Sequence, residues 1–149
     1  MKIEEEIKQP TFKNPYQKVA VNLIYTSNWL QGIQQDFFKA FGITSSQFNI
    51  LRILRGQHPN KISGVEIKAR MLDKNSDIPR LLERLLKKQL ISKSPCPIDK
   101  RAADILITDA GLDVLSKIDS HIDQTQKTHI HLSPAEAHQL SHLLDKCRG

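Results

Sequence analysis

The chain has 149 residues, of which 39% are apolar and 26% charged, and its formal net charge is +6. This length accommodates one domain with a substantial core, and the composition is that of a soluble globular protein. No apolar run approaches the roughly 20 residues of a membrane span, and the acidic start MKIEEEIKQP does not resemble a secretory signal. Two cysteines exclude a disulfide framework, so a cytoplasmic protein that does not engage a membrane is expected.

Positive charge is concentrated in the middle of the chain. Residues 50–101 contain thirteen Lys and Arg against five Asp and Glu, a net charge of +8, whereas the remaining residues carry a net charge of −2. A basic segment of this kind is expected to bind a polyanion. A solvated basic surface without a partner is the alternative that composition leaves open.

The first elements are an arm and a long helix. Residues 1–14 contain charges and a proline without periodicity, and they are expected to form a loose arm. Apolar residues then follow helical spacing over 15–42, where Gly42 can end the helix. About twenty-six helical residues at ~1.5 Å each span ~39 Å, which is long for a small domain. Its broad apolar stripe predicts packing against a second copy of the chain.

Capping sequences predict the next helix starts. In three places a Ser or Thr is followed three residues later by Gln or Glu: Thr44–Gln47, Ser63–Glu66 and Ser133–Glu136. These open helices to about residue 56, toward residue 72, and near the carboxyl terminus. Asn75 or Ser76 can cap a further helix over 76–88, and Thr108 can cap one to about residue 127.

Two short strands are predicted between these helices, over Leu90–Ser94 and Ala102–Thr108. In the second, Ala103, Ile105 and Ile107 alternate with residues of the other face. The connection over 95–101 is too long for a tight turn and predicts a projecting hairpin with a basic tip. The expected fold is therefore mainly α with a small β-hairpin wing, which is a winged helix-turn-helix.

The helix over 76–88 has an apolar stripe and a cationic face. With its leucines buried, Arg80, Arg84 and Lys88 share the outward face at i, i+4 and i+8. Neighbouring cations repel by on the order of a few tenths of a kcal/mol per pair unless an anion lies alongside. The DNA major groove admits a helix and offers both phosphates and base edges. A solvated amphipathic helix is the alternative, but the capping pattern and the hairpin together favour DNA binding.

The stretch from Ile43 to Ser120 resembles the MarR (multiple antibiotic resistance regulator) family of bacterial transcription factors. The resemblance is carried by ITSSQFNILRIL, SGVEIKARMLDKNSDIPRLLERLLKKQLISK and DKRAADILITDAGLDVL. It implies one MarR-type domain over 1–149, with dimerisation helices over 15–42 and 109–149 and a DNA-binding lobe over 43–108. It further implies a homodimeric regulator, expected to be a repressor, that reads a pseudo-palindromic operator and can respond to a small aromatic or lipophilic ligand.

The cation column and the resemblance together give the expected DNA contacts. Arg101 is expected to enter the minor groove, where narrow A·T-rich stretches concentrate negative potential. Asp99 is expected to orient a neighbouring arginine, and Lys100 to contact phosphate. The full set is Asn75, Ser76, Asp77, Pro79, Arg80, Arg84, Lys88, Asp99, Lys100 and Arg101.

The resemblance makes the helix over 76–88 the recognition helix. Two residues depart from the family pattern, one in the first turn of this helix and one just after its end. Pro79 stands where the family usually has Ser or Thr, so the expected contact loses a donor and a hydroxyl. Gln89 stands where the family has a glycine; a left-handed conformation there would cost ~1 kcal/mol, and a differently built helix end is the alternative.

The resemblance also places a ligand pocket between the dimerisation helices and the DNA-binding lobe. The residues expected to line it are Tyr25, Trp29, Phe48 and Arg52, with the arginine meeting a carboxylate. Packing of these aromatic side chains in the dimer core is the alternative for each of them.

Other chemistries find less support. His138 and His142 lie one helical turn apart after His129-x-His131, as in a metal-responsive regulator, but the polar helix around them favours no metal site. Cys96 lies near Lys100 and Arg101, which can activate a thiol, yet a rigid turn residue is the favoured interpretation. No phosphate loop, nucleophile motif or paired acids indicate an enzyme or a cofactor. The main rival is a winged-helix module that dimerises or binds proteins without binding DNA.

Overall fold

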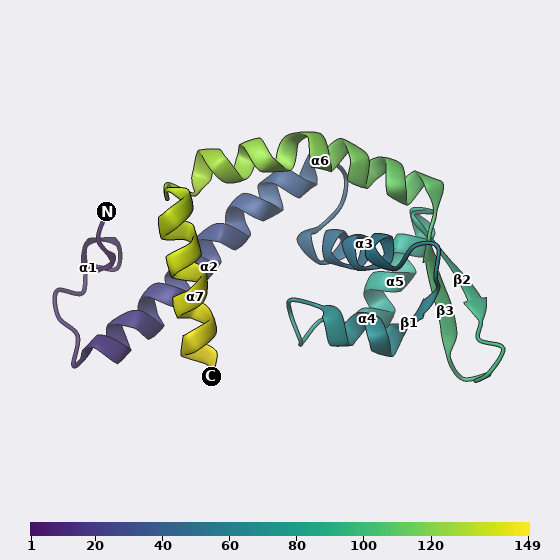
Figure 1. Cartoon of the computed structure of the whole chain (residues 1–149), viewed down its shortest axis with the longest axis horizontal. Helices are drawn as coiled ribbons and strands as arrows, with labels where there is room; N and C mark the ends of the chain where they lie inside the picture. Colours follow the sequence, from purple (N-terminus) through teal and green to yellow (C-terminus); the bar gives the residue numbers. More distant parts are fainter.

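Seven helices and three short strands make up the chain, and the computed structural model describes all of residues 1–149. In chain order they are α1 (Ile3–Glu6), α2 (Pro15–Lys39), α3 (Ser45–Gln57), β1 (Ile62–Ser63), α4 (Gly64–Arg70), α5 (Ile78–Lys87), β2 (Ile91–Pro95), β3 (Ala103–Ile107), α6 (Asp109–His129) and α7 (Pro134–Arg148). The predicted fold class is confirmed. Figure 1 shows α3, α4, α5 and the sheet gathered in one lobe, while α6 leads away from it toward α2 and α7.

The three predicted capping boxes all form. In the first, the Thr44 hydroxyl accepts the Gln47 amide at 3.1 Å, and the Thr44 amide donates to the Gln47 side chain at 3.2 Å. Ser63 with Glu66 and Ser133 with Glu136 repeat this exchange. Hydrogen bonds from the Ser63 backbone and hydroxyl hold the pKa of the Glu66 carboxyl below its usual value. Local sequence therefore determines where these helices begin.

The hydrophobic core lies inside the lobe. Its fully buried side chains come from α3, α4, α5, β3 and the first half of α6: Ile50, Leu51, Leu54, Ile67, Leu85, Ile105, Leu115 and Ile118. By contrast, α2 has one buried residue, Phe38, whose ring stacks on Phe48 with centroids 4.4 Å apart, and α7 has none. The core is thus concentrated in the lobe, and most apolar side chains of α2 and α7 remain uncovered.

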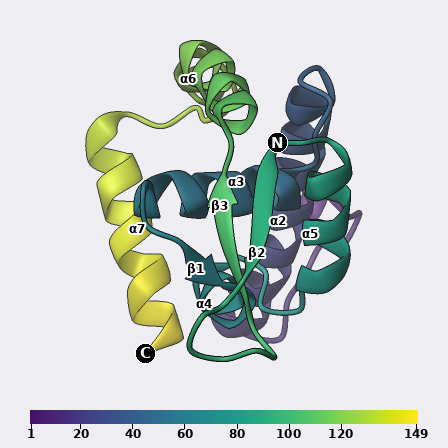
Figure 2. The same ribbon diagram turned by 90° about the vertical axis from the view of Figure 1, so that its right-hand side faces the viewer.

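The sheet is antiparallel with strand order β1-β3-β2. Ile105 of β3 pairs with Ile62 on one side and Lys93 on the other. The predicted alternation in β3 is confirmed, since Ile105 and Ile107 are buried. Strand β1 was not predicted, because two residues are too few to show alternation. Figure 2 shows the long β2–β3 hairpin projecting from the lobe with α5 beside it, and α5 packs against β2.

The amino-terminal arm is ordered, so the prediction of a loose arm was wrong for residues 3–6. Ile3 is buried, and the Lys18 ammonium lies 2.5 Å from the Glu4 carboxylate. That hydrogen bond lowers the pKa of Glu4. The Tyr25 hydroxyl donates to Glu6 at 2.7 Å, which raises the pKa of Tyr25. These tertiary contacts hold the short helix α1 against α2, and a pattern within residues 1–14 alone cannot reveal them.

Helix α6 is attached to the lobe at two points. At its start, Gly111 lies so close to the sheet that a Cβ atom there would come 2.3 Å from the Leu90 carbonyl oxygen and 2.7 Å from Ile107 Cγ1. Further along, Asp119 accepts two hydrogen bonds from the Arg55 guanidinium of α3, at 2.6 and 3.4 Å. The first half of α6 therefore moves with the lobe.

Helix α5 ends in a left-handed residue, so Gln89 keeps the conformation expected of a glycine and the helix end is not built differently. Gln89 has φ 60°, its amide donates to Leu86, and the next amide, of Leu90, donates back to Leu85 at 3.1 Å. These two bonds form a Schellman motif, in which glycine is the usual left-handed residue. The backbone at Gln89 is therefore strained, because Gln89 has a Cβ atom, whereas a glycine in the same conformation would not be strained.

Replacing Gln89 with glycine is expected to stabilise the chain by about 1 kcal/mol, because glycine adopts the left-handed region without steric penalty. The free energy of unfolding from urea denaturation measures the change. Gln89→Ala is the matched control and should give no such gain, since alanine retains a Cβ atom. A lower midpoint for the glycine variant would contradict the expectation.

Candidate nucleic-acid interface

The outward face of α5 carries two exposed arginines without ion-pair partners. Arg80 and Arg84 are one turn apart, and neither lies within 4.0 Å of a carboxylate oxygen. Lys87 instead pairs with Glu83 at 3.3 Å. The Lys88 ammonium donates to the Gly42 carbonyl, so it turns back toward the end of α2. The predicted column of three cations is therefore a column of two, because a free carbonyl at a helix end attracts the third.

The approach to α5 is held by local hydrogen bonds. Asp77 is the N-cap, since its carboxylate accepts the Arg80 amide at 3.2 Å, and the prediction of a cap at Asn75 or Ser76 was wrong. Ser76 is buried and its hydroxyl donates to the Asp73 carbonyl at 2.8 Å. Asn75 and Pro79 are exposed. This geometry leaves the Asn75 side chain free but gives no support to a base contact by Ser76.

Pro79 occupies the second position of α5. Amides in the first helical turn have no partner within the helix, so the missing N–H of proline removes no helical hydrogen bond there. Proline in place of the family's Ser or Thr therefore leaves the start of α5 intact, and the helix surface lacks only a polar side chain at this position.

Asn49 joins α3 to the loop before α5, and sequence reasoning missed it. The residue is 5% exposed, and its Oδ1 accepts the Leu72 amide at 2.9 Å. Its Nδ2 has no hydrogen-bond partner. An asparagine among the apolar residues of α3 is the only sequence signal, and it does not indicate which loop is bound.

The wing tip is closed by Asp99. Its carboxylate accepts the backbone amide of Arg101 at 2.9 Å, and its carbonyl accepts the amide of Ala102 at 3.1 Å. Asp99 was expected to orient an arginine side chain, but its carboxylate holds the Arg101 backbone amide instead and forms no ion pair. Cys96 is half-buried, and its amide donates to the Ala102 carbonyl at 3.3 Å, which places it within the hairpin ladder.

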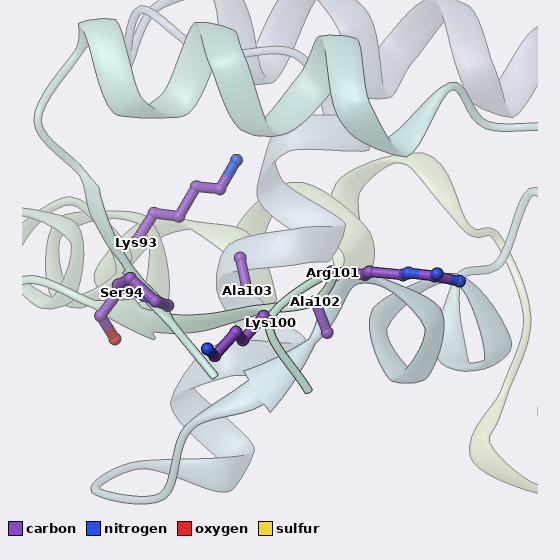
Figure 3. A pocket seen from close by; sticks show the side chains of 7 residues that line it. Lys93, Ser94, Lys100, Arg101, Ala102 and Ala103 are labelled. Carbon is purple, nitrogen blue, oxygen red and sulfur yellow. The ribbon is translucent and has the colours of Figure 1, made fainter. Parts of the chain in front are cut away.

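A hollow of about 440 Å³ lies along the wing, and Figure 3 shows its side chains. Its cationic members are Lys93, Lys100 and Arg101, and none of them is in an ion pair. In Figure 3 the Arg101 side chain extends away from the hairpin. Lys93 was not among the predicted contacts; its place on an exposed position of the first hairpin strand was the available signal. The hollow is shallow and cationic, as suits a surface for a polyanion.

A larger cavity, of about 890 Å³, lies between α2, α3, the last turns of α6 and the loop after α4. Of the four residues predicted to line a pocket, Phe48 and Arg52 line this cavity, whereas Tyr25 and Trp29 do not. Tyr25 is instead bonded to Glu6 of the arm. Phe37, Phe38 and His129 complete the aromatic lining, and Asn49 and Asp73 line the side toward α5.

No three His, Cys, Asp or Glu side chains come together as a group that could hold a metal ion. None of the helices is both long and apolar enough to cross a membrane.

The model of the MarR family matches residues 43–103, which cover the lobe from α3 to the start of β3. The comparison with curated proteins gave no match.

Solved structures resemble the chain over most of its length. A MarR transcription factor from Planctomyces limnophilus is 29% identical, with a TM-score of 0.71 over 91% of this chain and 98% of that one. A cysteine-to-serine mutant of MarR from E. coli, solved in complex with operator DNA, is 26% identical, with a TM-score of 0.73 over 85% and 91%. Bordetella bronchiseptica BpsR, whose DNA binding is regulated by 6-hydroxynicotinic acid, is 25% identical, with a TM-score of 0.77 over 89% and 99%. Residues 43–103 thus form a MarR-family domain, and the chain that carries it has the winged-helix fold of MarR transcription regulators.

Proposed function

We propose that the protein is a homodimeric transcriptional repressor that binds a pseudo-palindromic DNA site through α5 and the wing and is released by a small acidic aromatic ligand. The observation that carries the DNA-binding part is the pair of exposed, unpaired arginines on α5, Arg80 and Arg84, on the same lobe as the wing cations. Among the solved structures that resemble the chain, MarR of E. coli has been solved on operator DNA.

The electrostatics of the lobe favour a phosphate backbone as the partner. Surface arginines without carboxylates keep their full charge available, and guanidinium groups bind phosphate in a bidentate manner. A helix that enters the major groove places residues of its first turns near base edges. On α5 those are Pro79 and Arg80, with Asn75 in the turn just before the helix, whereas Arg84 lies one turn further on and is assigned to phosphate.

Dimerisation is supported by the uncovered faces of α2 and α7. None of the fifteen residues of α7 is buried, and Leu140 and Leu143 are 46% and 52% exposed. On α2, Ile24 and Trp29 are 64% and 43% exposed. A helix of fifteen residues such as α7 is only marginally stable in water without tertiary packing. These exposed apolar faces therefore require a partner, and a second copy of the chain supplies a matching surface. Two lobes related by a twofold axis would place their recognition helices ~34 Å apart.

The cavity supports a ligand that is aromatic and anionic. Phe37, Phe38 and Phe48 provide apolar walls, while Arg52 can pair with a carboxylate. Short hydrogen bonds connect the cavity lining to the start of α5. The Asn49 side chain accepts the Leu72 amide, and Asp73 accepts the Asn75 amide and the Ser76 hydroxyl. Displacement of this loop by a ligand would therefore shift the start of the recognition helix.

Arg84→Ala is expected to weaken binding to every duplex by a similar factor and to reduce the salt dependence by about one phosphate contact. Fluorescence anisotropy on duplexes selected from genomic DNA, between about 50 and 200 mM salt, measures both quantities. Lys87→Ala is the matched control, because Lys87 is on the same helix but pairs with Glu83; it should change the slope less.

A dissociation constant of the wild-type protein that ignores salt in this range would contradict the DNA-binding proposal, since a few phosphate contacts should change it by orders of magnitude. The protein would then be better described as a winged-helix module for protein interaction. An unchanged slope for Arg84→Ala alone would remove only this residue from the contact surface.

A further inference from the structure

Ile98 stands at the tip of the wing with its side chain almost wholly in water. It is 97% exposed, more than any other large apolar side chain in the chain. Single exposed apolar residues are common on protein surfaces and need no explanation by themselves. What distinguishes Ile98 is the rigid, cationic setting in which it is held.

The tip that presents Ile98 is fixed on both sides. Pro97 has a locked φ angle, and the turn after Ile98 is closed by the two hydrogen bonds that Asp99 accepts from Arg101 and Ala102. Isoleucine itself is stiff at χ1 because it is branched at Cβ. Little conformational freedom is therefore lost when the tip meets a partner, which is the condition under which a small contact contributes to affinity.

The surroundings of Ile98 identify the partner as anionic. Lys93, Lys100 and Arg101 line the hollow along the same hairpin, and none of them has a carboxylate partner. At the tip itself, Ile98 is followed by Asp99, whose carboxylate accepts the Arg101 amide, and then by Lys100 and Arg101, which have no carboxylate partner. An apolar side chain next to two such cations is complementary to a narrow groove with apolar sugar walls and phosphate rims. That surface is the DNA minor groove, and the wing projects from the lobe that carries α5 beside it (Figure 2).

We infer that Ile98 is a wedge residue: when α5 lies in the major groove, the wing tip enters the adjacent minor groove and Ile98 presses against a base step. Lys100 and Arg101 hold the groove walls on either side. Apolar wedges of this type unstack a step and kink the duplex, and pyrimidine–purine steps yield most easily. The wing thereby gains a preference for TA or CA steps without a hydrogen bond to any base. This inference rests on the proposed DNA-binding function.

The test uses the full-length protein and a selected duplex with 2-aminopurine placed at each step of the flank that footprinting shows to be covered by the wing. Unstacking raises the fluorescence of this base, and a residue with a merely structural role would leave it unchanged. The wild-type protein should raise the signal at one TA or CA step. Ile98→Ala should abolish the rise and weaken binding by about tenfold, the value of the apolar surface lost from contact. Ile98→Leu should keep both.

The outcomes separate the wedge from DNA binding itself. Ile98→Ala does not threaten folding, because the side chain packs against nothing, and an unchanged melting temperature confirms this. If wild-type protein binds with the expected salt dependence but raises no fluorescence, or if Ile98→Ala binds TA, CA and G·C flanks as tightly as wild type, the wedge is excluded while the DNA-binding function stands. If the wild-type protein binds no duplex in a salt-dependent manner, the proposed function fails first.

Discussion

Gly111→Ala is expected to destabilise the folded chain by about 3 kcal/mol, the upper part of the range for overpacked sites. The new Cβ atom would lie 2.3 Å from the Leu90 carbonyl oxygen. That oxygen cannot move freely, because it accepts the Thr108 amide at 3.1 Å and thereby joins the start of the hairpin to the start of α6. Urea denaturation followed by circular dichroism gives the free energy of unfolding.

A second glycine provides the control for this prediction. Gly56 lies within α3, and a Cβ atom there meets nothing within 4 Å. Gly56→Ala should therefore raise stability by up to about 1 kcal/mol, since alanine favours the helix. Equal urea midpoints for Gly111→Ala and the wild type would contradict the prediction. They would show that α6 can move away from the sheet without a loss of folding stability.

Ile24→Glu is expected to convert the proposed dimer to monomers and to lower the affinity for a two-half-site duplex by about 10²- to 10⁴-fold. A buried, unpaired carboxylate opposes association, and a monomer loses the gain of binding two half-sites at once. Light scattering measures the mass, and anisotropy measures the affinity.

Two variants at the same position separate dimer loss from charge repulsion by DNA. Ile24→Leu keeps the apolar surface and should keep the dimer, whereas Ile24→Lys should break it although it adds a positive charge. Recovery of DNA affinity in Ile24→Lys would mean that repulsion, and not dissociation, explains the effect of glutamate. A stable dimer of Ile24→Glu would remove this face of α2 from the interface.

The parts of the fold that are encoded locally could be predicted from the sequence. The three capping boxes and the alternation of β3 involve residues within a few positions of one another, and each has the predicted geometry. The order of helices and hairpin then follows. Strand β1 and helix α1 were missed because they are short and depend on partners distant in sequence: Ile62 pairs with Ile105, and Glu4 with Lys18.

The side chains of the candidate site were harder to predict, because their directions depend on neighbours that the sequence does not place. Three adjacent residues, Asn75, Ser76 and Asp77, can all cap a helix, and the bond of Ser76 to Asp73 decides in favour of Asp77. Lys88 was assigned to the outward face by its spacing, yet the Gly42 carbonyl draws it away. Spacing gives the face of a helix to which a residue belongs but not the contact that its side chain makes.

Helix α6 is one continuous helix that connects the wing to the cavity. Its 21 residues begin at the base of the wing, and its last turns line the cavity through Gln126 and His129. A rod of ~31 Å that tilts by ~10° about one end displaces the other by ~5 Å. That displacement exceeds the spacing of adjacent base pairs along DNA, ~3.4 Å. In the proposed dimer, a small tilt of α6 at the cavity would therefore be magnified into a mismatch of register between the two lobes and the proposed half-sites.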